Sequence, residues 1–415
     1  MKMLRSAFRL AALAFVFVGL VSAAVPIENV LKSAGQPQPT RILFIGNSYT
    51  YYHNLPEMLE GMANSGPAGR VIETKLVAKP GWTLEQHWRE GEALAAIRDG
   101  PWDYVVLQEQ STLGPTLVNG KTAISDPKYF HSSARAFDYA IKAAGAKTAL
   151  MLTWARKAYP EQQAALTYAY MSLGKELGAK VVPIGLVWEG ARKERAQLEL
   201  FESDGSHPSP TGTYLAACTF YAALSGQSPA GVPDRVSGHP VNDAGIVSSG
   251  PAVDLVDVPV ADAAWIKGAA WQTCERVRAA GGYILPMPPT RPVARELPAG
   301  QTPTISDLTG VWTGTLNLYG VPASIELRLG READQWKAEW QADIGGSEKF
   351  TSVVANFQTG GAEIFFSVPD RRGGIVTEIY RGVFTGDSLV GTAELGGETR
   401  VHLYGSWELR KAAPK

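Results

Sequence analysis

The alternation of strand-like and helix-like segments between residues 40 and 280 is the feature that most limits how this chain can fold. A continuous apolar run, Arg41–Ile45, precedes a helical stretch at 55–63, and the pattern then repeats. The further strand-like runs are 74–78, 104–107, 148–153 and 180–187, and the further helical stretches are 84–98, 132–144, 162–177 and 262–280, the last with Asp262 as a plausible N-cap. This alternation predicts an α/β fold, in which helices cover both faces of a parallel sheet.

The composition changes after residue 282. Prolines cluster between residues 286 and 303, which predicts a stiff, extended linker. Beyond them come short runs with Gly-rich turns, such as 324–329, where apolar and polar residues alternate. Such runs predict an antiparallel barrel or sandwich. The expected organisation is a signal peptide at 1–23, an α/β domain at 40–282, a linker at 283–305 and an all-β domain at 306–412.

The first residues have the pattern of an export signal. Lys2, Arg5 and Arg9 precede an apolar core at 10–21, and small residues at 21–24 offer a cleavage site. The core is too short to span a bilayer, although an uncleaved anchor is the alternative reading. Cleavage predicts a secreted or periplasmic protein with no membrane span, and it removes basic residues from a chain whose formal net charge is already −1. An acidic mature chain argues against nucleic-acid partners.

The chain contains two cysteines, Cys218 and Cys274. In an exported protein they could form one disulfide, and as small apolar side chains they could equally remain buried thiols. Neither has the spacing to a histidine that a metal site requires, so no metal site is predicted.

Two short stretches far apart in the chain can form one catalytic device. Ser48 directly follows the apolar run that ends in Gly46, and Asp204 and His207 share a later loop. A serine hydroxyl becomes a good nucleophile when an imidazole takes its proton and a carboxylate orients that imidazole. Pro210 begins the following helix with Ser209 as its predicted N-cap, which would fix the loop. The pattern predicts a Ser48–His207–Asp204 triad, although a capping serine and a solvated loop histidine are the plainer reading of each motif alone.

With these motifs the chain resembles the SGNH (GDSL-type) hydrolase superfamily, and within it a bacterial subgroup with a Gly-Asn-Ser-Tyr-Thr nucleophile block. The similarity covers about residues 40 to 280. The matching blocks, in order, are Gly46-Asn47-Ser48, Gly81-Trp82-Thr83-Leu84, Tyr104–Ser111 and Asp204-x-x-His207. The first and last blocks together are specific, whereas the middle two are weak alone.

The resemblance implies a flavodoxin-like, three-layer α/β/α sheet and an oxyanion hole. In this family the hole combines the backbone N–H groups of the nucleophile, here Ser48, and of the second-block glycine, here Gly81, with a side-chain amide. The third block lacks the usual Gly-x-Asn, so the amide would come from Gln108 or Gln110. We prefer Gln108 because it stands at the carboxyl end of its strand, and Gln110 could instead make a simple loop hydrogen bond.

Other residues admit two readings. Trp82, Trp154 and Trp188 could form a sugar-stacking platform for substrate or simply pack in the core. His53, close to Ser48, is expected to be structural. A literal Gly386-Asp387-Ser388-Leu389 also occurs, but it lies between two strand-like runs with no Asp-x-x-His after it. We therefore predict that it forms a hairpin turn.

The resemblance implies ester hydrolysis through an acyl-enzyme, with no metal or organic cofactor. Export, the tryptophans and the appended β domain favour acyl, above all acetyl, esters of saccharides or small molecules. A lipase or thioesterase of the same type, or a non-catalytic binding protein on the same fold, is the alternative. The β domain could bind carbohydrate or another surface, hold a small apolar ligand, or be only a structural appendage.

Overall fold

The computed structural model describes residues 38–66, 71–114, 117–118, 121–122, 124–125, 127–285, 304–318, 321–333, 335–343, 350–360, 362–369, 377–396 and 402–413. The predicted signal peptide and most of the predicted linker lie outside these residues, so the domain boundaries stay predictions. In the described part of the chain, no helix combines the length and the apolar character needed to cross a membrane.

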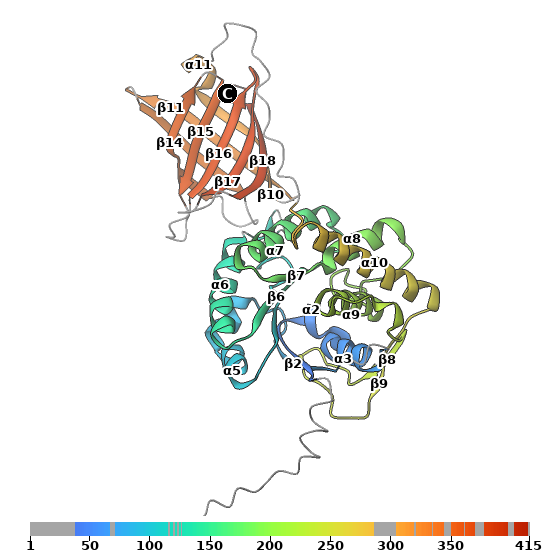
Figure 1. Ribbon diagram of the computed structural model, residues 1–415. Helices are drawn as coiled ribbons and strands as arrows, with labels where there is room; N and C mark the ends of the chain where they lie inside the picture. The colour runs from blue at the N-terminus through green and yellow to red at the C-terminus, as the bar shows by residue number, and fades with distance from the viewer. Residues whose placement is uncertain are drawn as a thin grey trace, which may run out of the picture. The chain divides into compact units, whose positions relative to one another are not determined.

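The first sheet has five parallel strands in the order β2-β1-β3-β6-β7 (Figure 1). Counted along this sheet, that is the order 2-1-3-4-5 of flavodoxin-like folds, which confirms the predicted fold class. The strands are β1 (Thr40–Gly46), β2 (Ile72–Ala78), β3 (Tyr104–Leu107), β6 (Lys147–Met151) and β7 (Lys180–Val182).

Helices cover both faces of this sheet because its strands are apolar on both sides. From β1, Ile42 and Phe44 enter one core, whereas Leu43 and Ile45 enter the other. The first core is closed by α3 (Leu55–Ser65), α8 (Ile184–Glu194), α9 (Pro210–Ser225) and α10 (Val260–Ala279). The second is closed by α4 (Leu84–Glu90), α5 (Glu92–Asp99), α6 (Pro127–Ala143) and α7 (Gln163–Leu177).

Two sequence predictions about element ends are wrong. The apolar run 180–187 is not one strand: β7 ends at Val182, and after Pro183 the chain continues as α8. Asp262 lies in the first turn of α10, which begins after Pro259. By contrast, Ser209 caps α9 as predicted, because its Oγ accepts the Gly212 N–H at 3.1 Å.

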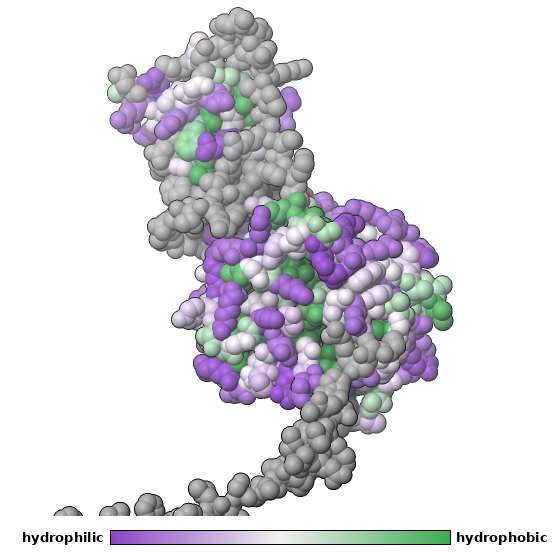
Figure 2. Space-filling model, in the orientation of Figure 1, coloured by the Kyte–Doolittle hydropathy of each residue, from purple (hydrophilic) through white to green (hydrophobic). Residues whose placement is uncertain are grey.

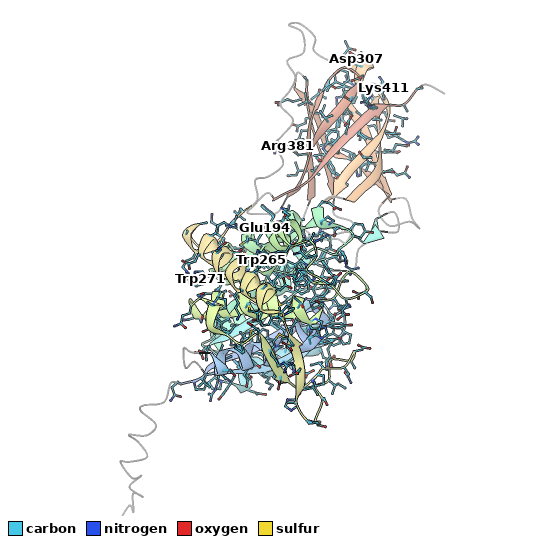
Figure 3. All side chains as sticks on the ribbon, turned by 90° about the vertical axis from the view of Figure 1, so that its right-hand side faces the viewer. Glu194, Trp265, Trp271, Asp307, Arg381 and Lys411 are labelled. Carbon is cyan, nitrogen blue, oxygen red and sulfur yellow. The ribbon has the colours of Figure 1, made fainter. Side chains whose placement is uncertain are left out.

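Shorter elements complete the α/β part. They are α2 (Ser48–Tyr51), η1 (Tyr52–Asn54), β4 (Leu117–Val118), β5 (Lys121–Thr122), η2 (Pro160–Gln162), η3 (Pro229–Gly231), β8 (Arg235–Gly238) and β9 (Val253–Asp257). Cys218 and Cys274 are both buried and both free thiols, so the open question of a disulfide is answered in favour of packing. Trp265 lies on α10 (Figure 3). The guanidinium of Arg195 lies over its ring, 5.9 Å from the ring centre.

The second sheet has nine antiparallel strands in the order β13-β12-β11-β10-β18-β17-β16-β15-β14. It curls around its own core: Trp340 of β12 meets Phe366 of β15 at 5.5 Å, although these strands lie near opposite ends of the sheet. This barrel-like sheet is the predicted all-β domain. Its strands are β10 (Gly310–Leu318), β11 (Val321–Glu332), β12 (Gln335–Asp343), β13 (Phe350–Val353), β14 (Ala355–Gly360), β15 (Glu363–Pro369), β16 (Thr377–Phe384), β17 (Ser388–Gly396) and β18 (His402–Lys411).

A short helix, α11 (Ile305–Leu308), precedes the first strand of the second sheet. Lys411 Nζ donates to the backbone carbonyl of Asp307 at 2.7 Å, which ties this helix to the last strand (Figure 3). Trp312 closes the same end of the core, because its indole N–H donates to the carbonyl of Leu308 at 2.8 Å.

The outside of the α/β part is mixed in character. In the face shown in Figure 2, hydrophilic residues cover much of the surface and smaller apolar patches lie between them. Exposed apolar side chains include Ile246, Val253 and Val260, which lie in or next to the β8–β9 and β9–α10 segments.

Candidate active site

Ser48 lies just after the carboxyl end of the inner strand β1, where the chain turns into α2. Asn47 is the N-cap of that short helix, and its Oδ1 accepts the Tyr49 N–H at 3.1 Å. Ser48 is therefore the first helical residue, a position at which a backbone N–H has no acceptor within the helix. The turn thus presents two groups of the same residue: the Ser48 hydroxyl and a backbone N–H that has no acceptor within α2.

Gly46 allows this turn to pack tightly. A Cβ at that position would lie 2.5 Å from both Gln108 Oε1 and Thr50 Oγ1, closer than any real contact. Gln108 Oε1 occupies the space because it accepts the Asn47 N–H at 2.8 Å and the Thr50 hydroxyl at 2.9 Å. The nucleophile turn is therefore fastened to the end of β3.

These contacts correct the preferred oxyanion role of Gln108. Its side chain is 0 % exposed, and its amide Nε2 donates to the backbone carbonyl of Glu109. The amide orientation is fixed by the N–H that Oε1 accepts from Asn47. Gln108 thus holds the turn from behind, with a fully buried amide whose one assigned bond runs to Glu109 and not towards the exposed side of Ser48.

The structure brings Asp204 and His207 to Ser48. His207 Nε2 lies 2.8 Å from Ser48 Oγ, and His207 Nδ1 lies 2.5 Å from Asp204 Oδ2. The other carboxylate oxygen, Asp204 Oδ1, accepts the backbone N–H groups of Ser206 at 2.8 Å and His207 at 3.0 Å. The carboxylate therefore fixes both the imidazole and the backbone that carries it.

Burial by itself would raise the pKa of Asp204. Hydrogen bonds from the His207 side chain and from the backbone N–H groups of Ser206 and His207 outweigh that effect and hold this pKa below its usual value. Asp204 consequently stays ionised at neutral pH, as a group that orients an imidazole and stabilises its cation must.

The second block is locked to the nucleophile turn at several points. Asn47 Nδ2 donates to the carbonyl of Trp82 at 2.8 Å, and His87 Nε2 bonds the carbonyl of Gly46 at 2.8 Å. Burial lowers the pKa of His87, so the neutral imidazole donates here. Gly81 is exposed and has a φ of +69°, which an L side chain rarely adopts. Its role as an oxyanion donor stays a proposal.

The third block contributes a buried acid that the sequence did not single out. Glu109 is 2 % exposed, and burial raises its pKa to about 7. Its carboxyl accepts the Gln110 N–H at 2.7 Å and the Leu84 N–H at 3.3 Å, which joins the third block to the second. Gln110, only partly buried, holds its own loop: Oε1 accepts the Thr112 N–H at 2.8 Å, and Nε2 donates to Ser111 Oγ at 3.2 Å.

Of the three tryptophans, two pack in the core and one remains partly exposed, as contact with a substrate would require. Trp154 is 0 % exposed, so the structure contradicts its proposed contact with substrate. Its indole is stacked between the rings of Tyr49 at 4.6 Å and Trp188 at 4.0 Å, and its N–H donates to the carbonyl of Ser206 at 3.1 Å. Trp154 and Trp188 therefore support the loop that carries Asp204 and His207. Trp82 alone of the three remains partly exposed, and its contact with substrate stays a proposal.

Two neighbouring residues belong to the site although no motif pointed to them strongly. The Tyr52 ring stacks on the His207 imidazole, with ring centres 4.2 Å apart and planes 8° from parallel. His53 Nε2 lies 2.9 Å from Glu202 Oε1, and the Glu202 N–H donates to the His207 carbonyl at 2.8 Å. In the sequence, only the position of Tyr52 and His53 shortly after the nucleophile block indicated that they lie at the site.

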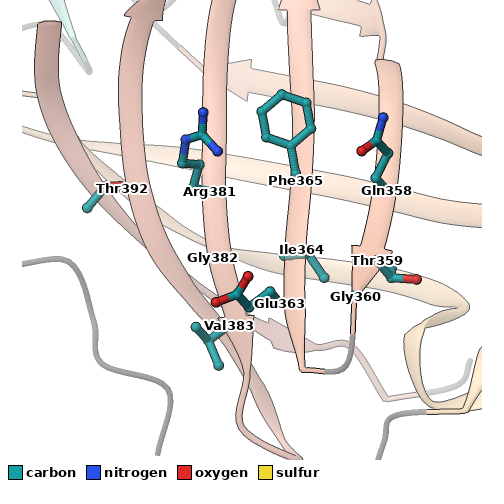
Figure 4. A pocket seen from close by; sticks show the side chains of 10 residues that line it. All are labelled: Gln358, Thr359, Gly360, Glu363, Ile364, Phe365, Arg381, Gly382, Val383 and Thr392. Atoms are coloured by element: carbon teal, nitrogen blue, oxygen red, sulfur yellow. The ribbon is translucent and has the colours of Figure 1, made fainter. Parts of the chain in front are cut away.

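Among the described residues of the second sheet, none hydrogen-bonds Ser48, Asp204 or His207. The literal Gly386-Asp387-Ser388-Leu389 forms the hairpin turn between β16 and β17, as predicted. A hollow of about 340 Å³ lies on the same sheet, and in it Arg381 lies over the Phe365 ring at 5.0 Å (Figure 4). Its other described lining residues are Gln358, Thr359, Gly360, Glu363, Ile364, Gly382, Val383 and Thr392.

With the geometry described, the chain can be compared with known proteins. No protein-family model matches it, and no curated protein matches it. Among solved structures it is similar to a candidate SGNH hydrolase from Slackia heliotrinireducens, with 27 % identity over 45 % of this chain and 100 % of that chain, at a TM-score of 0.38.

Two further solved structures show the range of similar proteins. One is a DUF4886 family protein from Bacteroides uniformis, at 18 % identity over 57 % of this chain and 95 % of that one, with a TM-score of 0.37. Another is an acetylxylan esterase from Geobacillus stearothermophilus, at 13 % identity over 45 % and 95 %, with a TM-score of 0.35. Similar solved structures thus include SGNH hydrolases, esterases and a DUF4886 family protein, and the roles of individual residues depend on the contacts described above.

Proposed function

We propose that this chain is an exported serine esterase that hydrolyses acyl esters through a Ser48–His207–Asp204 triad. The observation that carries the proposal is the continuous chain of contacts from Ser48 Oγ to His207 Nε2 at 2.8 Å and from His207 Nδ1 to Asp204 Oδ2 at 2.5 Å. A nucleophile, a base and an orienter in that order are the parts that acyl transfer needs.

In the proposed reaction, Ser48 Oγ attacks the ester carbonyl carbon while His207 Nε2 takes the hydroxyl proton. The tetrahedral oxyanion accepts hydrogen bonds from the backbone N–H groups of Ser48 and Gly81. The bond to the alcohol oxygen then breaks as His207 protonates that oxygen, which leaves an acyl-serine. Water attacks the acyl-serine while His207 takes its proton; the bond from the acyl carbon to Ser48 Oγ then breaks as His207 returns that proton to Oγ, and the carboxylic acid leaves.

Gln110 is the amide we propose as a third donor, since the Gln108 amide is turned away. Gln110 is partly exposed, and the three donors that meet its Oε1 would hold its amide nitrogen in one place: the Thr112 N–H at 2.8 Å, the Thr112 hydroxyl at 2.9 Å and the Gly114 N–H at 3.2 Å. Losing one oxyanion donor typically costs about 10²–10³ in kcat. Gln110→Ala is therefore expected to lower kcat by that factor.

We propose acetyl and other short acyl esters of carbohydrates as the substrate class. Partly exposed Trp82 beside the nucleophile turn supports this, because an indole can stack on a sugar ring. One structural neighbour is an acetylxylan esterase by its description. A panel of acetylated xylo-oligosaccharides, aryl acetates and long-chain lipids tests the class, and hydrolysis of the lipids alone would exclude it.

Labelling by a fluorophosphonate tests the triad itself. The wild-type chain and Ser388→Ala, which changes the serine of the β-sheet turn, are expected to be labelled, and Ser48→Ala is not. Ester turnover by Ser48→Ala should fall about 10⁴-fold or more. Equal labelling of Ser48→Ala and wild type would remove the basis of the proposal.

A second candidate function is a non-catalytic ester-binding protein on the same fold. The inward-turned Gln108 amide favours it, because the oxyanion hole then lacks the donor at that position. The two candidates differ in a simple result. An acetylated oligosaccharide that binds to purified protein, measured calorimetrically, but releases no acetate over hours would favour the binding protein.

A further inference from the structure

The aromatic ring of Tyr52 covers one face of the His207 imidazole. The ring centres are 4.2 Å apart and the planes are 8° from parallel, so the imidazole is stacked on the tyrosine π-face. A cation within about 6 Å of such a face is attracted by the negative π-electron density. Tyr52 therefore meets His207 on a side that the triad hydrogen bonds, which lie in the imidazole plane, do not use.

The backbone next to Tyr52 has an uncommon conformation that neighbouring contacts maintain. The two residues that follow it, His53 and Asn54, have φ values of +50° and +49°, in the left-handed region that non-glycine residues rarely adopt. Such strain persists only where neighbouring contacts enforce it. Asn54 Oδ1 accepts the Glu57 N–H at 3.4 Å, and its amide donates to the His239 carbonyl at 2.7 Å. The kink is therefore held by one contact to α3 and another to the segment that carries His239.

Tyr52 also contacts the nucleophile through its backbone. Its N–H caps α2 by donating to the carbonyl of Ser48, and its own carbonyl accepts the Thr213 hydroxyl at 3.4 Å. Tyr52 thus contacts α2, which carries Ser48, the helix α9, and the ring face of His207. A side chain placed only for bulk would not need this alignment with the imidazole.

Besides Tyr52, titratable groups of the described residues that contact the His207 ring include Asp204 on its own loop and Tyr49 on α2. Asp204 bonds the imidazole Nδ1, and the phenol ring of Tyr49 meets the imidazole edge-on at 5.8 Å. Burial raises the pKa of Tyr52, and the nearby carboxylates of Asp243, Asp204 and Glu202 raise it further. Tyr52 consequently stays a neutral phenol at the pH at which an imidazole titrates, and its ring keeps its negative face.

We infer that Tyr52 is a positioning residue that stabilises the His207 imidazolium formed as Ser48 attacks. The inference deepens the proposed esterase function and rests on it for the catalytic effect. The stacked ring lowers the free energy of the cation relative to the neutral imidazole, and it fixes the ring plane so that Nε2 points at Ser48 Oγ. Both effects apply in the transition state for attack and again in that for deacylation.

The test compares Tyr52→Leu, which removes the ring, with Tyr52→Phe, which keeps it. The His207 titration is followed by NMR of histidine-labelled, substrate-free protein, with the His207 signal assigned by its loss in His207→Asn. We expect the titration midpoint in Tyr52→Leu to fall by about half a pH unit. Tyr52→Phe should match the wild type, as should Tyr139→Leu, which removes an exposed tyrosine from α6.

Turnover of an aryl acetate gives the second readout. In Tyr52→Leu the acid limb of the kcat/KM profile should move to lower pH by the same amount, and the plateau of kcat should fall about fivefold with little change in KM. Replacing Tyr52 by pentafluorophenylalanine keeps the shape and reverses the charge of the ring face, so it should shift the midpoint at least as far without disturbing folding.

An unmoved midpoint in both the leucine and the pentafluorophenylalanine variants overturns the inference, as does an equal shift in Tyr52→Phe. These outcomes are separate from failure of the proposed function. The NMR titration needs no substrate, so a shifted midpoint in a chain that cleaves no ester would retain the stacking effect and reject only the esterase. Ester turnover with an unmoved midpoint would retain the proposed esterase and reject the stacking effect of Tyr52.

Discussion

Two serines with the same exposure show how differently the two parts of the molecule use one residue type. Ser48 and Ser388 are each 8 % exposed, and each follows an Asn or Asp and a glycine. Ser48 Oγ lies 2.8 Å from an imidazole that comes from 159 residues away. Within the described part of the chain, Ser388 Oγ bonds close neighbours, Thr385 Oγ1 at 2.6 Å and Asp387 Oδ1 at 3.3 Å.

The difference follows from the kind of sheet. In a parallel sheet the carboxyl ends of strands meet at one edge, so loops distant in sequence are brought together there. In an antiparallel hairpin the turn joins two adjacent strands, and its side chains meet mainly each other. The motif that looks more like a GDSL nucleophile in letters is therefore the one without a partner base among the described residues.

The largest expected difference between the two parts is in kcat after the aspartate of each motif, Asp204 or Asp387, is replaced by asparagine. Asp204→Asn should lower kcat on an aryl acetate about 10⁴-fold, because the amide can hold His207 in the wrong tautomer. Asp387→Asn, in the β-sheet turn, should change kcat by less than about twofold. Steady-state kinetics of both variants measure this, and comparable losses would abolish the contrast between the two motifs.

A second difference concerns the pH dependence of stability. Glu109 has a pKa raised to about 7 by burial, so the folded chain holds a proton that the unfolded chain loses near pH 4.5. Its contribution to stability is full below that lower value and is lost as the pH rises towards 7. In Glu109→Gln this fall, up to about 3 kcal/mol in the free energy of unfolding, should disappear.

Denaturant unfolding between pH 4.5 and 7.5 measures that slope, which is independent of any constant loss caused by the substitution. Asp307, in α11 of the β-sheet part, is the matched control. Hydrogen bonds from Thr304 hold the pKa of Asp307 below its usual value, so Asp307→Asn should leave the slope in this window unchanged. A wild-type slope that survives Glu109→Gln would contradict the assignment.

The two motif glycines should also respond differently to alanine. Gly46→Ala places a Cβ 2.5 Å from Gln108 Oε1, so we expect a loss of about 1–3 kcal/mol in stability together with reduced kcat as Ser48 shifts. At Gly386 the space is open but φ is +100°, so Gly386→Ala should cost about 1 kcal/mol and leave kcat unchanged. Thermal unfolding and kinetics of both variants separate a steric cause from a conformational one.

The smallest effect is expected from removing the β-sheet part. A chain that ends after Pro289 should keep kcat/KM on a soluble aryl acetate within about twofold, because the described contacts of Ser48, Asp204 and His207 all come from the α/β part. The same chain is then assayed on polymeric acetylated xylan. A tenfold loss on the soluble ester would show that the β-sheet part belongs to the site.

Sequence reasoning succeeded where a signal is local or periodic. The alternation of segments predicted the parallel sheet, and Ser209-Pro210 predicted the start of α9. It failed at 180–187, because a short apolar run does not distinguish a strand from a buried helix, and Pro183 divides the two. It also failed for Gln108 and Trp154, since residue type alone cannot say whether a side chain at a strand end turns inward.

By itself, the sequence determined the chemical groups and the class of fold: a hydroxyl after an apolar strand, an Asp-x-x-His loop, and an alternation that only a helix-covered parallel sheet satisfies. The tertiary structure alone decided which groups face one another. It turned the Gln108 amide away from Ser48, buried Trp154 under the triad loop and laid Tyr52 against His207. The physical reason is that hydrogen bonds and ring contacts between residues far apart in the chain depend on the angles at which packed elements meet, and no local pattern of residues encodes those angles.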